Sequence, residues 1–259
     1  MTSGQRTFFA DERHAEVLRL LTAERRVESA WLAKHFGVSA ESIRKDLAQL
    51  EGRGLLRRVH GGAVPVQRLG EEPSVATRTE QAEQKLAIAR HALRFVPRGG
   101  TLLLDAGTTT LRLAELLPTD ADLVVYTNSV PVLTTLLQRG IAVVGLGGRV
   151  RVETMAAVGP LTIEALGGIN ADVAFLGTNA VSFRRGLTTP DPDEALVKHE
   201  MLAAARQRVF LVDTSKFGLE SRARHATLTD VDVLVTDGAL TPDQHDRLLA
   251  ADVTVEVAR

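Results

Sequence analysis

A glycine and three threonines follow an apolar run in an arrangement suited to holding an anion. The run at 101–105 ends in Asp105, and leucines at helical spacing begin at residue 111. Between them stand Gly107, Thr108, Thr109 and Thr110. A glycine lets the backbone approach a bound group, while amide N–H groups at a helix start and threonine hydroxyls donate to an oxyanion. Asp105 suits sugar hydroxyls better than phosphate. A simply capped helix start is the alternative interpretation.

Two further apolar runs end in polar or glycine-rich corners. One ends at Thr127 and Asn128, and another ends in the glycines around Gly147. Ligands of open α/β sheets bind beyond the carboxyl ends of strands, so several such corners favour a ligand pocket. The glycines at 145–148 lack the spacing of a dinucleotide fingerprint, and the sequence contains no Walker A motif.

Two lysines are candidates for the same pocket. Lys216 comes just after an apolar run, in Val212-Asp213-Thr214-Ser215-Lys216, and a lysine there can reach the mouth of a strand-end pocket. Lys198 stands four residues after Glu194 on a predicted helix. That spacing favours an ordinary surface ion pair between the two side chains.

A second constellation indicates DNA binding. In SAESIRKDLAQL (39–50), the apolar residues Ile43, Leu47 and Leu50 form one helical stripe, which leaves Ser42, Arg44, Lys45 and Gln49 outward. A tight turn at 37–39 separates this helix from the one before it, as in a helix-turn-helix. The second helix of that motif enters the major groove, where Arg and Lys bind guanine or phosphate. A solvated charged helix is the alternative.

A basic hairpin follows this helix. LLRRVHGG (55–62) contains Arg57, Arg58 and His60 before two glycines that favour a tight turn. Such a hairpin would form a wing beside the recognition helix. Because Arg57 and Arg58 are consecutive in a strand, we expect them on opposite faces. Ser39, Ser42, Arg44 and Lys45 complete the predicted DNA-binding set.

The elements that must position these residues differ between the two parts of the chain. The pattern of residues 13–64 predicts short helices followed by a hairpin. We expect Ser29 to cap the second helix and Gly37 to end it. Ser39 would cap the third helix, which Gly52 or Gly54 would end. Beyond residue 82, apolar strands alternate with helices at 110–117, 130–138, 193–206 and 242–250. The predicted strands are Thr101–Asp105, Leu123–Thr127, Ile141–Leu146, Asp172–Leu176, Arg208–Val212, Asp232–Val235 and Val253–Val257.

This alternation predicts a mainly parallel α/β sheet covered on both faces. We expect a DNA-binding domain at 1–64, a linker at 65–80, which is poor in large apolar residues, and an α/β effector-binding domain at 81–259. Residues 1–62 carry 11 Lys+Arg and 8 Asp+Glu, although the whole chain of 259 residues has a net charge of −1. A basic module on an acidic body fits that division.

Composition excludes several other classes. The chain has no cysteine, so disulfides and thiolate metal sites are excluded, and its seven histidines lack zinc-type spacing. No run approaches the roughly 18 apolar residues that span a bilayer. We expect a cytoplasmic protein with no membrane partner, no metal and no cofactor.

The chain also resembles a known family. The segments RHAEVLRLL and WLAKHFGVSAESIRKDLAQLEGRGLLRRVHGGAV, which lie between Arg13 and Val64, resemble the winged helix-turn-helix of the DeoR family of bacterial transcription regulators. The family's third helix usually reads Thr-Ile-Arg-Arg-Asp-Leu, so Ser42 and Lys45 depart from it. Lys45 keeps the charge but lacks the planar fork of arginine, which leaves the operator sequence open.

The resemblance extends through DAGTTT, YTNS, LGGR, FLGTNA, the 193–198 stretch and VDTSKFG, which look like the DeoR-type sensor domain. It implies a fold similar to ribose-5-phosphate isomerase and a phosphorylated sugar as effector. The implied effector residues are Asp105, Gly107, Thr108, Thr109, Thr110, Thr127, Asn128, Gly147, Lys198 and Lys216. The implied function is a DNA-binding regulator, usually a repressor of carbohydrate metabolism genes, acting as a homo-oligomer (dimer or tetramer) on a double-stranded DNA operator.

An isomerase-like enzyme fused to a DNA-binding module is the alternative. Aldose–ketose isomerisation needs a base and a group that stabilises the enediolate. The isomerase family has an Asp-Gly-Ala-Asp-Glu cluster after the corresponding strand, whereas this chain reads Gly177-Thr178-Asn179-Ala180 without an acid. Glu194 would be the base, with its acidic partner missing. We therefore expect binding without turnover.

Overall fold

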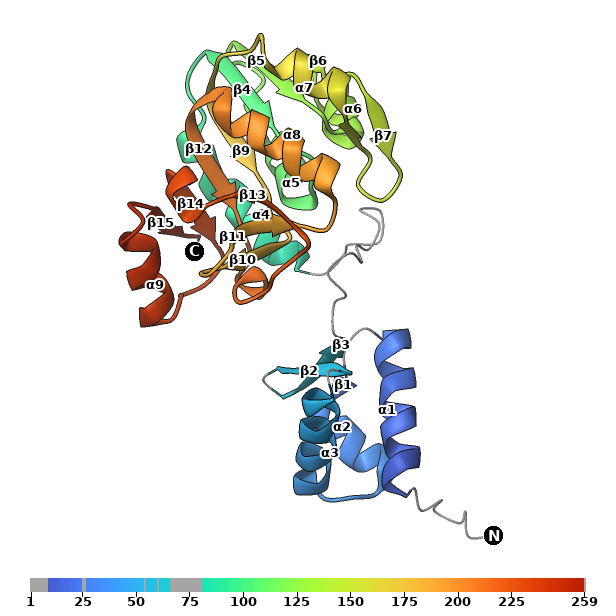
Figure 1. Ribbon diagram of the computed structural model, residues 1–259. Coiled ribbons are helices and arrows are strands. Elements are labelled where there is room, and N and C mark those ends of the chain that lie inside the picture. Colours follow the sequence, from blue (N-terminus) through green and yellow to red (C-terminus); the bar gives the residue numbers. More distant parts are fainter. Residues whose placement is uncertain (1–8, 25–26, 54, 60, 66–80, 259) are drawn as a thin grey trace. The chain divides into compact units, whose positions relative to one another are not determined.

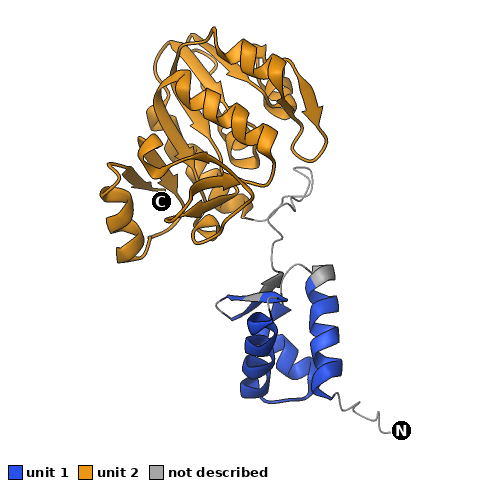
Figure 2. Ribbon diagram, viewed as in Figure 1, with its two compact units in different colours: residues 1–68 blue, residues 69–259 orange. Residues whose placement is uncertain are grey.

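The computed structural model describes residues 9–24, 27–53, 55–59, 61–65 and 81–258, apart from the side chains of residues 22–24, 57, 64 and 65. The chain divides into two compact units, residues 1–68 and 69–259, shown in different colours in Figure 2. The segment predicted to be a linker lies almost entirely outside the described residues.

The first unit is a winged helix-turn-helix (Figure 1). Its helices are α1 (Ala10–Glu24), α2 (Ser29–Phe36) and α3 (Ala40–Gly52), and its strands are β1 (Val27–Glu28), β2 (Leu56–Val59) and β3 (Gly62–Pro65). The strands pair antiparallel in the order β1-β3-β2. Leu32, Ile43, Leu47 and Leu50 are fully or almost fully buried in its core, as the helical stripe predicted.

The turn between α2 and α3 depends on two residues. Gly37 ends α2 in the left-handed region, with φ 64°, where a residue without Cβ meets little strain. Ser39 caps α3, and its side chain accepts a hydrogen bond from the backbone N–H of Ser42 at 3.1 Å. The predicted cap at Ser29 is wrong, because Ser29 is already helical and its N–H donates to the carbonyl of Gly61.

The second unit contains a seven-stranded parallel sheet. Its strands are β4 (Gly100–Leu104), β5 (Leu123–Thr127), β6 (Ala142–Gly145), β9 (Ala171–Leu176), β12 (Ala205–Leu211), β14 (Val233–Thr236) and β15 (Thr254–Val257). They lie in the order β15-β14-β12-β9-β4-β5-β6, and every neighbouring pair is parallel. The predicted fold class is confirmed.

Helices cover both faces of this sheet. The helices α4 (Ala82–Ala92), α5 (Thr108–Leu116) and α6 (Val130–Gln138) share one core with Leu102 and Leu104 of β4. The helices α7 (Pro160–Leu166), α8 (Pro192–Ala203) and α9 (Pro242–Leu249) belong to the elements that pack with Leu103 on the other face. Because successive strand residues point to opposite faces, one strand contributes to both cores.

Smaller strands decorate the sheet and were not predicted. β7 (Arg149–Arg151) and β8 (Ala156–Val158) form an antiparallel hairpin, and β10 (Ala180–Ser182), β11 (Gly186–Thr189) and β13 (Ala223–Ala226) form a second antiparallel sheet. These strands have three or four residues, too few to show a clear alternation in the sequence. Short 3-10 turns η2 (Leu93–Phe95), η3 (Thr214–Lys216) and η4 (Leu228–Asp230) complete the described elements.

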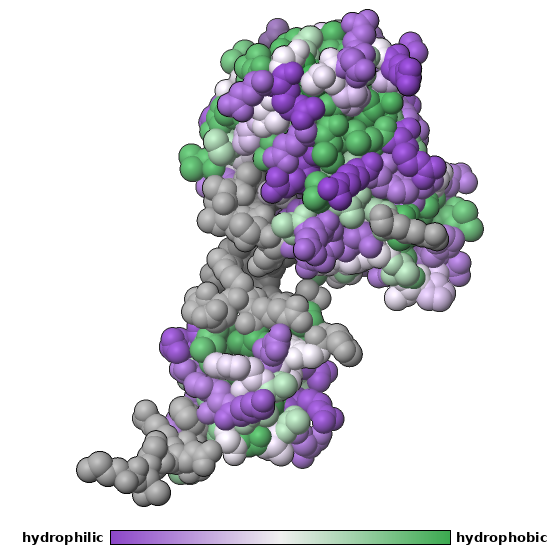
Figure 3. Space-filling view, turned by 180° about the vertical axis from the view of Figure 1, so that it is seen from behind, coloured by the Kyte–Doolittle hydropathy of each residue, from purple (hydrophilic) through white to green (hydrophobic). Residues whose placement is uncertain are grey.

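The surface mixes polar and apolar side chains. In Figure 3, hydrophilic residues are interspersed with apolar groups, and an apolar area is visible on the second unit. Exposed apolar side chains of this unit include Leu137, Val152, Leu161 and Leu196. Among the described helices, none has the length and apolar character needed to cross a bilayer.

Candidate nucleic-acid interface and effector pocket

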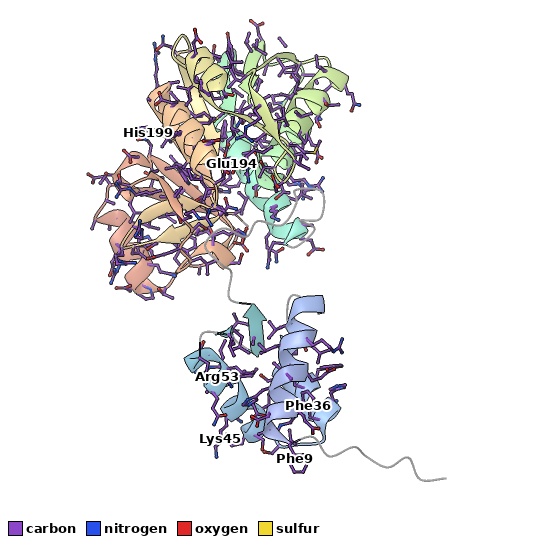
Figure 4. The ribbon with its side chains drawn as sticks, turned by 45° about the vertical axis from the view of Figure 1, so that its right-hand side comes forward. Phe9, Phe36, Lys45, Arg53, Glu194 and His199 are labelled. Carbon is purple, nitrogen blue, oxygen red and sulfur yellow. The ribbon has the colours of Figure 1, made fainter. Side chains whose placement is uncertain are left out.

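The outer face of α3 is polar and basic. Arg44, Lys45 and Gln49 are exposed, and the guanidinium of Arg44 forms a solvent-exposed ion pair with Glu41 at 3.2 Å. Figure 4 shows Lys45 on the side of α3 away from α1, and Arg53, the C-cap residue of α3, is also exposed. These cations are placed where a recognition helix presents side chains to base edges and phosphates.

A buried carboxylate fixes α3 against α1. Asp46 is 5% exposed and accepts two hydrogen bonds from Arg13, at 2.8 and 3.1 Å. The Nε2 atom of His14 lies 3.1 Å from the same carboxylate. The hydrogen bond to Asp46 raises the pKa of Arg13 above its usual value. Sequence reasoning missed this cluster, because Asp46 lies between the basic pair and Leu47 and has no local partner.

The other predicted DNA contacts have mixed positions. Arg58 donates from its backbone and its guanidinium to Glu51, at 2.8 and 2.7 Å, in a largely exposed pair. The hydroxyls of Ser39 and Ser42 lie 3.0 Å apart at the start of α3. Arg57 belongs to β2, but its side chain is not described, and His60 lies outside the described residues.

A pocket lies at the carboxyl ends of the three neighbouring strands β12, β9 and β4. From β4 the chain proceeds outward through β5 and β6, and it then returns to place β9 on the other side of β4. Parallel sheets bind ligands at such a reversal of strand order. The loops after these three strands therefore converge there, joined by residues of α4, α8 and the β7–β8 hairpin.

Six of the predicted effector residues line this pocket together: Gly107, Thr108, Thr109, Thr110, Lys198 and Lys216. Sequence reasoning missed Lys85, Thr154, Thr178, Asn179 and Asp213, which also line it. Lys85 looks like any surface lysine of an amphipathic helix in the sequence, yet only 7% of it is exposed. Thr178, Asn179 and Asp213 follow predicted strands, so the strand-end rule could have included them.

Asp105 and Lys198 form a buried ion pair, of which Lys198 lines the pocket and Asp105 does not. The ammonium of Lys198 donates to the Asp105 carboxylate and, at 3.0 Å, to the carbonyl of Gly177. The N–H of Gly177 donates to Asp105 at 3.1 Å. The expected surface pair between Lys198 and Glu194 is therefore wrong, because both side chains are buried and each binds a different partner. Glu194 instead binds Arg151.

Besides Asp105, three predicted effector residues do not line the pocket. Thr127 donates to the carbonyl of Leu104 at 2.7 Å, and Asn128 donates to the carbonyl of Ala157 at 3.2 Å. The carbonyl of Gly147 accepts from Thr162. These residues lie at or just after the ends of β5 and β6, on the opposite side of β4 from β9. Their polar groups bind neighbouring elements, and these residues are not part of the candidate pocket.

The pocket offers donors and acceptors together. Among the described residues, α5 has no side chain capping its N-terminus at Gly107, so its first N–H groups are available to an anion. The ammonium of Lys216 makes no hydrogen bond or ion pair with the residues that the structure describes. The carboxylates of Glu194 and Asp213 add acceptors. Thr110 is fully buried, and its hydroxyl donates to the carbonyl of Gly107 at 3.0 Å.

Fold and site together define a class of protein, in which a winged helix-turn-helix is joined to an α/β unit with a polar strand-end pocket. Two family models match this chain: the DeoR-like helix-turn-helix domain at residues 13–68 and the DeoR C terminal sensor domain at residues 80–238. The chain belongs to the DeoR family of transcriptional regulators.

Curated relatives cover almost the whole chain. The HTH-type transcriptional regulator GlpR of Haloferax volcanii is 39% identical over 247 residues, covering 94% of this chain and 96% of that protein. The glycerol-3-phosphate regulon repressor of Escherichia coli is 29% identical over 227 residues, covering 87% and 90%. These relatives are named as regulators, which agrees with the prediction that the chain is not an enzyme.

Among solved structures, the chain is similar to ribose 5-phosphate isomerase A from Methanocaldococcus jannaschii. The identity is 19%, the match covers 53% of this chain and 55% of that chain, and the TM-score is 0.41.

Proposed function

We propose that this regulator is a repressor of carbohydrate metabolism genes and that a phosphorylated sugar controls it. The head, at 1–64, binds a double-stranded DNA operator through α3 and the β2–β3 wing. The body, at 81–259, binds the effector, with residues 65–80 as the linker. The name of the glycerol-3-phosphate regulon repressor, a relative of similar length, supports this assignment.

One observation supports a sugar phosphate as the class of effector. The uncapped N-terminus of α5 and the ammonium of Lys216 line the same pocket as the carboxylates of Glu194 and Asp213. Backbone amides at a helix start and a cation favour a phosphate. Carboxylates repel phosphate but accept hydrogen bonds from hydroxyls. A small molecule with both groups, such as a sugar phosphate, matches that lining.

The proposed mechanism follows from linkage. A homo-oligomer, either a dimer or a tetramer, places one α3 in each major groove of repeated or inverted half-sites. The effector binds one arrangement of subunits better than another. Because of this difference in affinity, effector binding shifts the equilibrium between the two arrangements and changes the affinity of the DNA-binding domains for the operator. Release of the operator by the effector would relieve repression.

The test of this function is a thermal-shift screen of the full chain against pentose, hexose and triose phosphates. The corresponding unphosphorylated sugars serve as controls. We expect at least one sugar phosphate to raise Tm in a saturable manner, because a ligand that binds only the folded state stabilises it, while its unphosphorylated counterpart has no effect. Equal shifts from both, or no shift across the panel, would contradict the assignment of the pocket.

A separate assay addresses turnover. The pure protein is incubated with each sugar phosphate that binds, and the products are followed over time. We expect the sugar phosphate to be recovered unchanged, because the strand after which an isomerase carries its acidic cluster is followed here by Gly177, Thr178 and Asn179. Steady formation of an isomeric sugar phosphate would contradict a purely regulatory role.

A further inference from the structure

The β7–β8 hairpin and α8 meet at Glu194, on the wall of the effector pocket. Glu194 is 5% exposed, and its carboxylate binds the guanidinium of Arg151 and the hydroxyl of Thr154, both contributed by the hairpin. Thr189 of β11 donates to the same carboxylate at 3.3 Å. Figure 4 shows Glu194 on the inner side of α8 and His199 on the outer side. Glu194 therefore faces the pocket from a position set by three other side chains.

In addition to Glu194, Arg151 binds the N-cap residue of α8. Its side chain is 11% exposed, and its Nε lies 3.3 Å from the carboxylate of Asp191. Asp191 is the N-cap of α8 and accepts a hydrogen bond from the N–H of Glu194 at 3.0 Å. One planar guanidinium thus contacts two carboxylates within the same helix turn. Such a fork fixes direction as well as charge, which a lysine cannot do.

We propose that Glu194 binds the hydroxyl groups of the effector and that Arg151 is the positioning residue that aims its carboxylate. The effector would lie with its phosphate toward the start of α5 and Lys216, and with its hydroxylated part toward Glu194. The proposal rests on the proposed function. It assigns to Glu194 the preference of the pocket for phosphates that carry hydroxyl groups over phosphates that carry none. Pairing with Arg151 and the threonine hydroxyls compensates the burial of the carboxylate, which would otherwise be costly.

A neighbouring ion pair supplies a matched control. Arg149 lies on the same strand, two residues before Arg151, and binds Asp193 of the same helix turn at 2.6 Å. This pair also joins the hairpin to α8, but its side chains are 63% and 47% exposed, and neither residue lines the pocket. Arg149→Gln therefore removes the same kind of link and the same charge without touching the proposed hydroxyl site.

The experiment measures Kd by isothermal titration calorimetry on the full chain. The probes are inorganic phosphate, n-propyl phosphate, glycerol 3-phosphate and ribose 5-phosphate, so that hydroxyls are added to a constant phosphate. The wild type is expected to bind at least one hydroxylated phosphate about 10-fold or more tightly than n-propyl phosphate, as hydrogen bonds to a charged group provide. Glu194→Gln should lose most of that ratio and keep its affinity for n-propyl phosphate.

The arginine variants test positioning. Arg151→Gln should reduce the same ratio, Arg151→Lys should restore part of it, and Arg149→Gln should leave it unchanged. Circular dichroism and Tm check that each variant folds, and Arg151→Lys retains the positive charge if Arg151→Gln does not fold. If the preference for hydroxylated phosphates fell only in variants that also lost affinity for n-propyl phosphate, the substitutions would have damaged the pocket as a whole. That result would overturn the proposal.

Two results distinguish a failure of this inference from a failure of the proposed function. If the wild type bound all the phosphates, and Glu194→Gln kept the full preference for hydroxylated ones, the hydroxyl site would be wrong and the phosphate pocket would stand. If the wild type bound none of the four probes, the phosphate pocket would fail, and the assignment of Glu194 would fail with it.

Discussion

At the scale of residues, the two candidate sites use charge in opposite ways. The cations on the outer face of α3 are exposed, so they can exchange solvent for phosphate or guanine. Two charged groups that line the pocket are buried in fixed pairs, Lys198 with Asp105 and Glu194 with Arg151. Exposed ion pairs contribute little to stability, whereas breaking a buried pair leaves a costly unpaired charge.

Arg44→Ala should weaken operator binding and leave effector binding unchanged. The loss of one base or phosphate contact costs about 1–3 kcal/mol, or roughly 5- to 150-fold in Kd. An operator selected from a random-sequence duplex pool provides the DNA, and fluorescence anisotropy at fixed salt provides the measurement. Arg19→Ala removes the same charge from α1 and is the control. Equal losses in the two variants would argue against specific recognition by α3.

His225 should make the stability of the sensor unit depend on pH. Burial lowers the pKa of His225 well below its usual 6.5, and the nearby Lys198 and His199 lower it further. The unfolded chain therefore binds a proton near pH 6.5 that the folded chain does not bind. Stability should fall as the pH is lowered from 7 to 5, by up to about 1.4 kcal/mol per pH unit for this one group.

The measurement is urea unfolding of the wild type and His225→Gln at pH 7, 6 and 5. The variant lacks the titrating group, so its stability relative to the wild type should improve toward pH 5. The imidazole Nε2 lies 3.0 Å from the hydroxyl of Thr178, and glutamine can also hydrogen-bond there. A difference in stability that stayed constant over this pH range would show that His225 does not titrate as described.

Apart from Lys198, which lies on α8 and was implied by the family resemblance, the pocket residues predicted from the sequence follow predicted strands. Gly107 to Thr110 and Lys216 follow β4 and β12, so local pattern sufficed for them. Arg151 and Thr154 come from a three-residue strand and its turn, and their partner Glu194 lies about 40 residues later. Only the folded arrangement brings them together, because no local periodicity encodes that pairing.

At the scale of elements, the main sheet was predictable because its strands are continuous apolar runs. β5 and α6 have the predicted bounds, and β4, β9 and β15 differ by one residue at one or both ends. β12 begins three residues earlier than predicted, because Ala205 and Gln207 pair with β9 even though this end of the strand is polar. Pairing with β9 therefore extends β12 beyond the apolar residues that predicted the strand.

Gly62→Ala should disrupt the wing. A Cβ at Gly62 would lie 1.9 Å from the carbonyl oxygen of Val27, within the pairing of β1 and β3. We expect a loss of about 1–3 kcal/mol in the free energy of unfolding of the first unit, as for other overpacked positions, together with weaker operator binding. Urea unfolding monitored by Trp31 fluorescence reports on this unit, which contains the only tryptophan of the chain.

The control for the wing is Gly52→Ala. A Cβ at Gly52 meets nothing within 4 Å, and this residue lies in the last turn of α3. Alanine favours helix over glycine, so the variant should be neutral or slightly more stable. If Gly62→Ala were as stable as Gly52→Ala, the close approach of β1 to β3 would be wrong.

At the scale of the whole molecule, the proposed function requires that the two units communicate. A pocket that binds an anion and a head that binds DNA make a regulator only if occupation of one changes the affinity of the other. That coupling is reciprocal, so operator DNA must also alter effector affinity by the same factor. Relief of repression by the effector is the proposed sign of the coupling.

The most direct test of the central claim is the affinity for selected operator DNA, measured by anisotropy with and without a saturating sugar phosphate found in the screen. We expect the effector to weaken operator binding by the wild type about 5- to 150-fold, the usual range of allosteric coupling. Thr108→Ala combined with Lys216→Ala should bind the operator normally and ignore the effector. An operator Kd that the effector leaves unchanged in the wild type, or a double variant that still responds, would contradict the account.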